Sequence, residues 1–264
     1  SILDVSYFNT SSGINMTKMF SDAQILVSLD VSKFDTKNVK DMYAMFENCW
    51  EVTSLDVSHF NTSLVQDMEN MFLSCGSLEE LDVSHFDTSK VIYMSNMFRD
   101  VKKVTQLNLL NFNTRNVIDM SGMFFNCFKL QSLDVSSFNT EKVHNMHSMF
   151  YHLSVITSLD ISNFNTKNVE NMAFLFANSM KLIDLNFKGI DTSQVTDMSC
   201  MFRTLSSLTS LDLSNFNTEY VLDMSFMFQS SVKLKSLDLS NFNVKNVKTM
   251  ENMFLTKLSC TRNN

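Results

Sequence analysis

The sequence predicts an elongated α/β solenoid of ten 26-residue coils, each with one short strand and one short helix. A leucine followed by Asp or Asn recurs every 26 residues from Leu3 to Leu237, with no insertion or deletion. A Met-x-x-Met-Phe pattern recurs with the same period, broken once by Leu175. The chain has no proline and only four glycines, so no linker divides it. Because each repeat contacts only its neighbours, we expect one solenoid over residues 1–264.

The strand is predicted from the coil that contains Leu29. Residues 28–32 read Ser-Leu-Asp-Val-Ser, and this alternation of polar and apolar side chains is typical of a half-buried strand. Phe34 follows and is expected to point inward. Stacking of the ten coils then predicts a parallel sheet that runs along the solenoid.

The helix is predicted from the segment that follows. Asp35 and Thr36 offer short side-chain oxygens of the kind that cap the first turn of a helix. The apolar residues after them share one helical face: Val39, Met42, Met45, Phe46 and Cys49. A helix is wider than a strand, so we expect strands on the concave side and helices on the convex side. A strand and a helix in one such unit also match the length of leucine-rich repeats, about 20–29 residues.

The repeated methionines allow two interpretations. Thioethers are soft ligands, so Met-x-x-Met suggests a copper site. However, the two methionine columns run through every coil and keep the same phase as Val39 and Phe46. Core packing, for which methionine is a flexible filler, is therefore the favoured interpretation.

Composition excludes several classes of function. The net charge of −7 disfavours binding to nucleic acid and to anionic lipid. No apolar run reaches the roughly 18 residues of a membrane span, and no signal-peptide pattern opens the chain. We find no nucleophile–base pair and no phosphate-binding glycine loop, and so predict no enzymatic activity. The chain starts within a repeat and ends without a polar cap, which predicts a fragment of a longer protein.

The five cysteines do not form a disulfide framework. Cys49, Cys75 and Cys127 share one column with Ala23 and leucines, which indicates small buried side chains. A bridge between Cys49 and Cys75, in adjacent coils, stays open as an alternative.

An exposed Asp follows the strand leucine in eight of the ten coils. Stacked carboxylates near 5 Å apart would repel by ~0.8 kcal/mol per pair in bulk water, so something should compensate. One interpretation is hydrogen bonding to the Ser two residues later. The other is a bridging Ca²⁺ or similar hard cation, which prefers oxygen ligands. The candidate metal ligands are Asp30, Asp56, Asp82, Asp134 and Asp160.

A ligand site is predicted on the concave strand face, where outward-pointing columns vary. Its candidate residues are Lys33, His59, His85, Asp30, Asp56 and Asp82. Two coils depart from the pattern, at Leu110 and at residues 185–190, either as a contact site or through drift of a tolerant repeat.

Two further patterns are predicted to be structural or solvated. An Asn/Asp-Thr pair in each coil, such as Asp35-Thr36, is expected to cap the helix and to bond from coil to coil. His144, His147 and His152 lie close in sequence but lack a suitably spaced carboxylate, so we predict a solvated surface.

The stretch LTSLDLSNFNTEYVLDMSFMF, residues 208–228, resembles the repeat of about 25 residues found in bacterial surface lipoproteins and adhesins, best known from mycoplasmas, lactobacilli and listeriae. That family is related to the BspA-like leucine-rich repeats, whose A-F-x-x-C is similar to M-F-x-x-C at residues 45–49. The resemblance covers essentially the whole chain. It implies a leucine-rich-repeat-like solenoid on an extracellular, surface-attached protein used in adhesion or host interaction, with no catalytic residues.

We therefore predict a noncatalytic extracellular module that recognises a protein or glycan on the surface of a host or neighbouring cell. The alternative is a structural spacer or self-assembling surface element, stabilised by cations along the Asp column.

Overall fold

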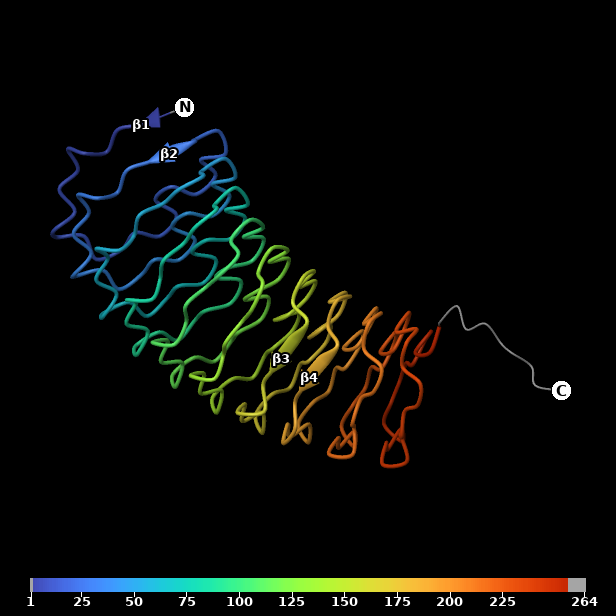
Figure 1. The fold of residues 1–264 in the computed structure, drawn as a ribbon. Helices are drawn as coiled ribbons and strands as arrows, with labels where there is room; N and C mark the ends of the chain where they lie inside the picture. The colour runs from blue at the N-terminus through green and yellow to red at the C-terminus, as the bar shows by residue number, and fades with distance from the viewer. Residues whose placement is uncertain (1, 256–264) are drawn as a thin grey trace.

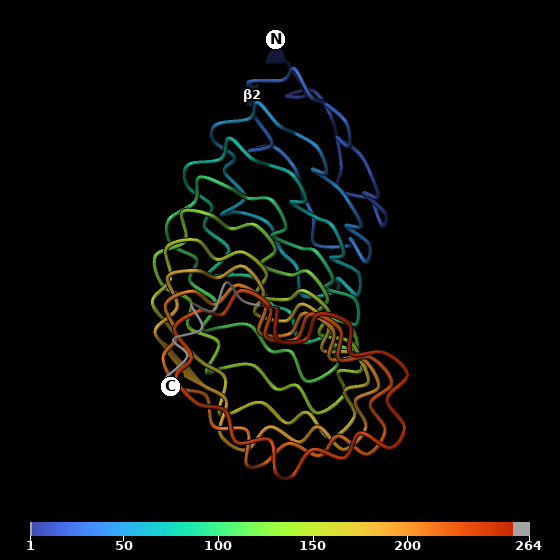
Figure 2. The same cartoon turned by 90° about the vertical axis from the view of Figure 1, so that its right-hand side faces the viewer.

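A computed structural model of the chain describes residues 2–255 as a curved and twisted solenoid (Figures 1 and 2). We number its coils from the leucine column, so that coil 1 begins at Leu3, coil 2 at Leu29 and coil 10 at Leu237. The coils stack in sequence order, and the two ends of the described chain lie at opposite ends of the stack. The predicted stack of repeats is confirmed.

Four short strands form around the repeated leucine, where strands were predicted. They are β1 (Ile2–Leu3), β2 (Ser28–Leu29), β3 (Ser158–Asp160) and β4 (Asp184–Asn186). β1 pairs with β2 and β3 with β4, both in parallel and with a 26-residue register, so that Leu159 lies opposite Leu185. A continuous sheet through all coils is not formed in residues 2–255.

The continuous parallel ladder lies one residue before the first Met of each coil. Its bridges join Asn15, Asp41, Asp67, Tyr93, Asp119, Asn145, Asn171, Asp197, Asp223 and Thr249 in turn. This ladder opens the segment that was predicted to be a helix, which we call the turn segment (residues 42–49 in coil 2).

The predicted helix is wrong, because residues 2–255 contain no helix. The turn segment consists of overlapping turns: the N–H of Met45 donates to the carbonyl of Met42 at 3.2 Å, and the N–H of Cys49 donates to that of Phe46 at 3.2 Å. Ala44 and Asn48, the third residues of these two turns, have φ of 52° and 57°. A positive φ at that position is typical of a type II turn and interrupts a helix.

The alternate N–H groups of the turn segment bond to the next coil. Met42 donates to the carbonyl of Asp67 at 3.0 Å, and Ala44 to that of Glu69 at 2.8 Å. In a helix these N–H groups would bond within their own segment. Turns three residues apart direct the same side chains inward as a helix does, so the apolar spacing alone did not separate the two structures.

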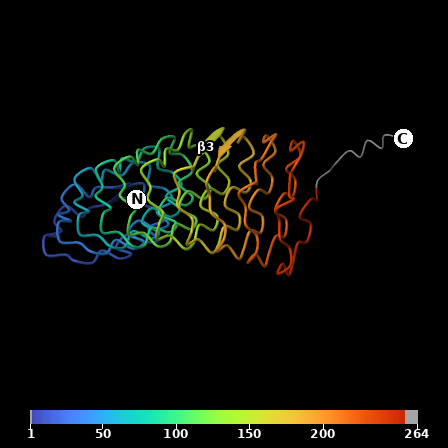
Figure 3. The same cartoon turned by 90° about the horizontal axis from the view of Figure 1, so that it is seen from below.

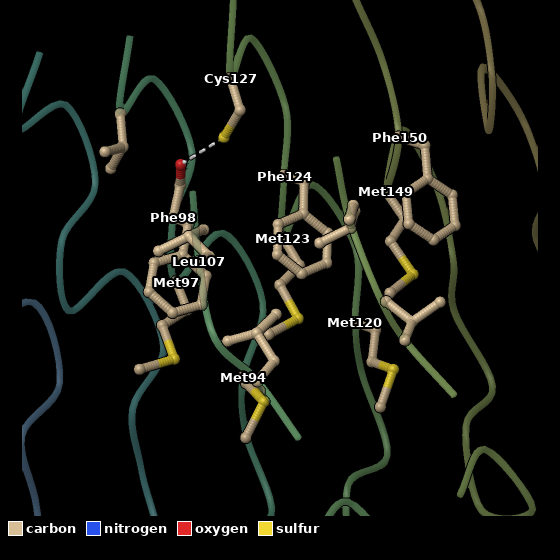
Figure 4. Close-up of a cluster of buried hydrophobic side chains, with 14 of the residues drawn as sticks. Met94, Met97, Phe98, Leu107, Met120, Met123, Phe124, Cys127, Met149 and Phe150 are labelled. Atoms are coloured by element: carbon tan, nitrogen blue, oxygen red, sulfur yellow. Dashed lines mark hydrogen bonds between the residues drawn. The ribbon is translucent and has the colours of Figure 1, made fainter. Parts of the chain in front are cut away.

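Methionine and phenylalanine fill the interior, as predicted. Met42, Met45 and Phe46 are each 0% exposed. Figure 4 shows that the methionines of three successive coils lie beside the phenylalanines that follow them. The thioethers are therefore part of the apolar core, and the core-packing interpretation is confirmed.

The solenoid bends toward the turn segments. Stacked rings of the Met-Phe column, such as Phe46 and Phe72, have centroids 5.7–6.0 Å apart. Stacked rings of the upstream column, such as Phe112 and Phe138, are 6.3–6.5 Å apart. The coils are thus closer together on the turn side, and in Figure 1 the described chain ends on the inner edge of the bend. Strands were predicted to line the concave side because a helix is wider than a strand. This prediction is wrong, since compact turns take the place of the wide helix. Seen from below, β3 lies near one margin of the solenoid (Figure 3).

The Thr column joins adjacent coils, as predicted. The Thr36 hydroxyl donates to the Asn61 carbonyl at 3.1 Å and accepts the Asn61 N–H at 2.7 Å. The same exchange recurs along the chain, and Thr36 is 2% exposed. With no helix to cap, Asp35 instead accepts the Lys37 N–H at 3.1 Å to stabilise a tight turn.

Candidate binding surfaces

The Asp column is held by its own serines. Oδ1 of Asp30 accepts the Ser32 N–H at 2.9 Å, and Asp56, Asp82, Asp134 and Asp160 make the same bond to the Ser two residues later. This hydrogen bonding, the first of the two interpretations, is confirmed.

These bonds also set the charge state of the column. Hydrogen bonds from Ser32 lower the pKa of Asp30, and those from Ser58 lower the pKa of Asp56; repulsion from Asp56 raises the pKa of Asp30 only as a smaller effect. The carboxylates are therefore ionised at neutral pH. Among residues 2–255, no three His, Cys, Asp or Glu side chains are grouped so as to hold a metal ion. Cation bridging by Asp30, Asp56, Asp82, Asp134 and Asp160 stays a prediction.

The other predicted ligand residues lie near the Asp column, and one has a structural partner. Lys33, His59 and His85 are exposed. The His59 Nε2 lies 2.9 Å from the Val31 carbonyl in the previous coil, where the N–H tautomer donates. Ser58 hydrogen bonds are the main cause of the lowered pKa of Asp56, and His59 and His85 lie close enough to this carboxylate to add a smaller effect.

Other side chains in the column of His59 also form hydrogen bonds to the preceding coil. The Asn163 amide donates to the carbonyls of Val135, Ser136 and Phe138 at 3.2–3.3 Å. Asn241 donates in the same way to Leu213, Ser214 and Phe216, and Asn111 donates to Ser84. In these coils, different side chains of the column thus bond to carbonyls of the preceding coil.

Three grooves open on the strand face, two coils apart. They lie between coils 4 and 5, coils 6 and 7, and coils 8 and 9. Backbone bonds such as Glu79 N–H to Thr53 carbonyl, 3.3 Å, connect the intervening coils on this face. No backbone bond joins residues 79–86 to 105–112, residues 131–138 to 157–164, or residues 183–190 to 208–216, all of which are described. The grooves therefore open where this bond is missing.

A cluster of partly exposed aromatic side chains that was not predicted from the sequence lies on the turn segments. It faces solvent on the concave side of the solenoid. The Tyr151 ring stacks on the Phe125 ring with centroids 4.4 Å apart and 9° between planes. The Arg99 guanidinium lies 4.0 Å from the centroid of Phe125. Phe174 contacts Tyr151 from coil 7 at 6.2 Å, so the stack crosses four coils.

Histidines extend the cluster. His152 meets Phe128 edge to face at 4.7 Å, and His147 meets Phe174 at 5.6 Å. Burial lowers the pKa of both histidines, which favours their neutral form at pH 7. The prediction that His147 and His152 are simply solvated is wrong, because both are partly buried against rings. We call this cluster the aromatic ridge: Arg99, Phe125, Phe128, His147, Tyr151, His152 and Phe174.

The charge around the ridge is opposite to that of the protein. In the turn segments of coils 4–8 and the residues after them (95–105, 121–131, 147–157, 173–183 and 199–209), the cations are Arg99, Lys102, Lys103, Lys129, Lys181 and Arg203. Asp100 is the one acid in these ranges, and Arg99 and Lys102 both lie 3.6 Å from its carboxylate. Asp197 and Asp119, two rungs and one rung of the ladder away from the coil of His147, raise the pKa of His147 as smaller effects than burial, which lowers it.

The ridge residues are not part of the repeated pattern, so a search for repeated residues does not reveal them. Each of its residues occupies a column whose identity changes from coil to coil, such as Glu47, Leu73, Arg99, Phe125 and Tyr151 in one column. A helix would have spread these positions around its circumference. The turn ladder instead aligns them at one edge.

The cysteines are buried and inert. Cys49, Cys75, Cys127 and Cys200 are free thiols, so the alternative of a Cys49–Cys75 bridge is not realised. The Cys49 thiol donates to the Phe20 carbonyl at 3.2 Å, and in coil 7 the Ser179 hydroxyl makes the matching bond to Phe150 at 3.0 Å. Cys260 lies outside the described residues.

Comparison with known proteins identifies one sequence family. A family model described as "Mycoplasma protein of unknown function, DUF285" matches residues 2–79, 44–158, 100–187 and 179–263. A search of curated proteins gave no match.

Several solved structures are similar at low identity. A chain of the Drosophila Toll–Spatzle complex is 16% identical, with a TM-score of 0.37 over 66% of this chain and 23% of its own. The functional domain of InlJ from Listeria monocytogenes is 16% identical, with a TM-score of 0.34 over 94% of this chain and 59% of its own. A leucine-rich repeat protein from Bacteroides ovatus is 14% identical, with a TM-score of 0.35 over 86% and 70%. The chain thus spans less than two thirds of the first two.

Proposed function

Because the chain belongs to the DUF285 family of Mycoplasma proteins, whose function is unknown, we propose a role for it from its own surfaces: a noncatalytic module that recognises a partner protein through the aromatic ridge. The observation that carries this proposal is the stack of Arg99, Phe125 and Tyr151 across adjacent coils. Tyr, Arg and other large aromatic side chains dominate the binding energy of protein interfaces.

The ridge has little other use for the fold. Its rings are partly exposed, while the core is already filled by the Met-Phe columns. A hydrogen bond also holds the Tyr151 side chain in place: the Asn178 amide donates to its hydroxyl at 2.5 Å. Side chains that are held in place before a partner arrives lose less entropy on binding.

The charges favour an acidic partner. The ranges given above contain six cations, Arg99 of the ridge and five others, and one acid. Ring edges carry partial positive charge, and the Phe125 and Tyr151 rings are both partly exposed. A partner with exposed Asp and Glu side chains therefore meets complementary charge, which speeds association and suppresses wrong partners.

A glycan is a weaker fit to the same surface. Sugars stack on ring faces, but both faces of Phe125 are covered, one by Arg99 at 4.0 Å and the other by Tyr151 at 4.4 Å. The proposed partner is therefore a protein on the surface of a host or neighbouring cell, and the proposed location of the chain is extracellular. In the described part of the chain, no helix is long and apolar enough to cross a membrane.

The experiment measures binding of poly-L-glutamate, of heparin and of a panel of purified surface proteins by biolayer interferometry. The test variant is Lys102→Glu/Lys129→Glu, at the ridge. Its control is Lys33→Glu/Lys245→Glu, which makes the same charge change at exposed positions elsewhere. We expect acidic proteins and polyglutamate to lose affinity at least about tenfold in the ridge variant only. Capture that is equal in both variants contradicts the proposal, and capture of heparin alone replaces the protein partner with an acidic glycan.

A second candidate function, self-assembly, is favoured by the separation of charge. The Asp column is exposed on the strand face, whereas the cations gather around the ridge. Contact between these surfaces on two copies is heterologous and extends into filaments. Sedimentation at rising protein concentration separates the candidates: association abolished by Lys102→Glu/Lys129→Glu supports assembly.

A further inference from the structure

The groove between coils 8 and 9 differs from the other two grooves of the strand face. In the first two, an asparagine of the second coil spans the opening: Asn111 donates to Ser84 at 2.7 Å, and Asn163 donates to Ser136 at 3.3 Å. Asn215 occupies the equivalent position in coil 9 and makes no hydrogen bond. The third groove is therefore the one among the described residues that no such side chain closes.

Substitutions in coil 8 account for the opening. Phe187 takes a position held by Val or a similar residue in the other coils, and Ile190 takes a position held by Phe. Phe187 packs against Phe202 at 5.9 Å and edge-on against Phe216 at 5.8 Å, between coils 8 and 9. Gly189 turns the chain after it with φ of 93°. In this altered coil the Asn215 amide makes none of the bonds to the preceding coil that Asn163 and Asn241 make to theirs.

The resulting pocket has a volume of about 300 Å³, at the lower end of ligand pockets. Its floor is apolar, with Leu185, Phe187 and Leu211. Its exposed polar residues carry charges of both signs: Asp184 at the start of β4, Lys188 after that strand, and Asp212 in coil 9.

The charged groups are ordered along the strand direction. Asp184 begins β4, and Lys188 lies four residues later, in the turn that follows the strand, where its N–H donates to Asn186 Oδ1. The Lys188 ammonium makes no ion pair, but its charge lowers the pKa of Asp212 after the larger effect of the Ser214 hydrogen bonds. Asp184 accepts a bond from the Ser158 hydroxyl at 3.2 Å through Oδ2. Asp184 thus lies at one end of the apolar pocket and the donors Lys188 and Asn215 at the other, with Asp212 at an intermediate level and within reach of the Lys188 charge.

We propose that this pocket binds a free amino acid with an apolar side chain. Its carboxylate bonds to Lys188 and Asn215, its ammonium group faces Asp184 and Asp212, and its side chain lies on Phe187. A purely anionic ligand leaves two carboxylates unpaired, and a purely cationic ligand leaves the lysine unpaired; a zwitterion satisfies both.

The test is isothermal titration calorimetry of the whole chain with three probes. L-Leucine carries both charges, N-acetyl-L-leucine lacks the ammonium, and L-leucinamide lacks the carboxylate. We expect leucine to bind and each derivative to bind at least about tenfold more weakly, the effect of losing one charged hydrogen bond. L-Serine, which keeps both charges, tests the apolar floor and is expected to bind more weakly than leucine.

Two variants restore residues that the repeat uses elsewhere. Lys188→Ser and Asp184→Ser each introduce the serine that most other coils carry at that position, so both are expected to fold, as circular dichroism can verify. Both should weaken leucine binding about tenfold, while Lys33→Ser, on coil 2, should not. Equal binding of all three leucine probes, preference for either single-charge probe, or no binding of leucine at millimolar concentration overturns the proposal.

Discussion

The ring of Phe46 lies 5.7 Å from the ring of Phe72 in the next coil, with 8° between their planes. This displacement is shorter than the 6.5 Å between Phe112 and Phe138 in the upstream column. The turn segments therefore form the inner side of the bend and carry the aromatic ridge on it. The choice between turns and a helix decides which surface of this chain is concave.

Phe46 and Met42 should differ sharply in tolerance to substitution. Both are 0% exposed, but Phe46 stacks on rings in two adjacent coils. Phe46→Ala is expected to destabilise the chain by about 3–5 kcal/mol, because a cavity replaces the ring. Met42→Leu conserves volume and should cost less than about 1.5 kcal/mol. Urea unfolding of both variants measures the difference, and copper-dependent stability of the wild type would contradict the core role of the methionines.

Gly122 should be the least replaceable glycine of the described chain. It has φ of 60°, and a Cβ there would overlap the side-chain oxygen of Asn96. Gly122→Ala is expected to cost at least about 1–2 kcal/mol, the penalty for a left-handed residue, before that overlap is added. Gly76 is the matched control, since its φ is not positive and the nearest atom to an added Cβ is 3.6 Å away. Gly76→Ala should stabilise by about 0.4–1 kcal/mol in the same assay.

Period and alternation were sufficient to predict the stack of coils, the place of the strands and the inward methionines. The turn segment was mistaken for a helix because residues such as Met42 and Met45 keep a three-residue spacing in both structures. The signal against a helix was the column of Asn48, Asp100 and Asn126, since Asn and Asp tolerate positive φ better than other side chains.

The ridge was beyond the sequence analysis for a related reason. Contact between Phe125 and Tyr151 depends on the two coils having the same turn conformation, which a repeat consensus does not encode. The irregular residues 185–190 were noticed from the sequence. Their effect on Asn215 required the hydrogen bonds of the intact columns for comparison.

The buried thiols should resist thiol–disulfide exchange with added reagents. Burial raises the pKa of Cys49 to about 11 and raises the pKa of Cys75 and Cys127 as well, so few thiolates exist at pH 8. A Cys260→Ser variant, which leaves four cysteines, is expected to react with Ellman's reagent only after unfolding in guanidinium. Rapid labelling of the folded variant would show that the coils open locally at the Cys column.

The pH dependence of stability should have opposite signs at two carboxylates. Hydrogen bonds from Ser58 lower the pKa of Asp56 in the folded chain. Its contribution is therefore present above the ordinary carboxyl pKa near 4 and is lost as the pH falls through the lowered folded value. Asp56→Asn keeps the turn, as Asn108 does at 3.3 Å, but loses this contribution. The variant should be less stable than wild type at pH 7, and the gap should close toward pH 2.

Asp67 is the control with the opposite sign. Burial raises its pKa, with repulsion from Asp41 adding to this, while the Glu69 N–H partly offsets the effect. The ionised carboxylate therefore opposes folding at neutral pH, and this cost disappears as the pH falls and Asp67 is protonated. Asp67→Asn keeps its turn, as Asn171 does with the Ala173 N–H at 2.9 Å, and should be more stable than wild type at pH 7. Urea midpoints at pH 7, 5 and 3 measure both variants. Gaps of the same sign would show that the Ser58 hydrogen bonds at Asp56 and burial at Asp67 do not control the ionisation of these two carboxylates.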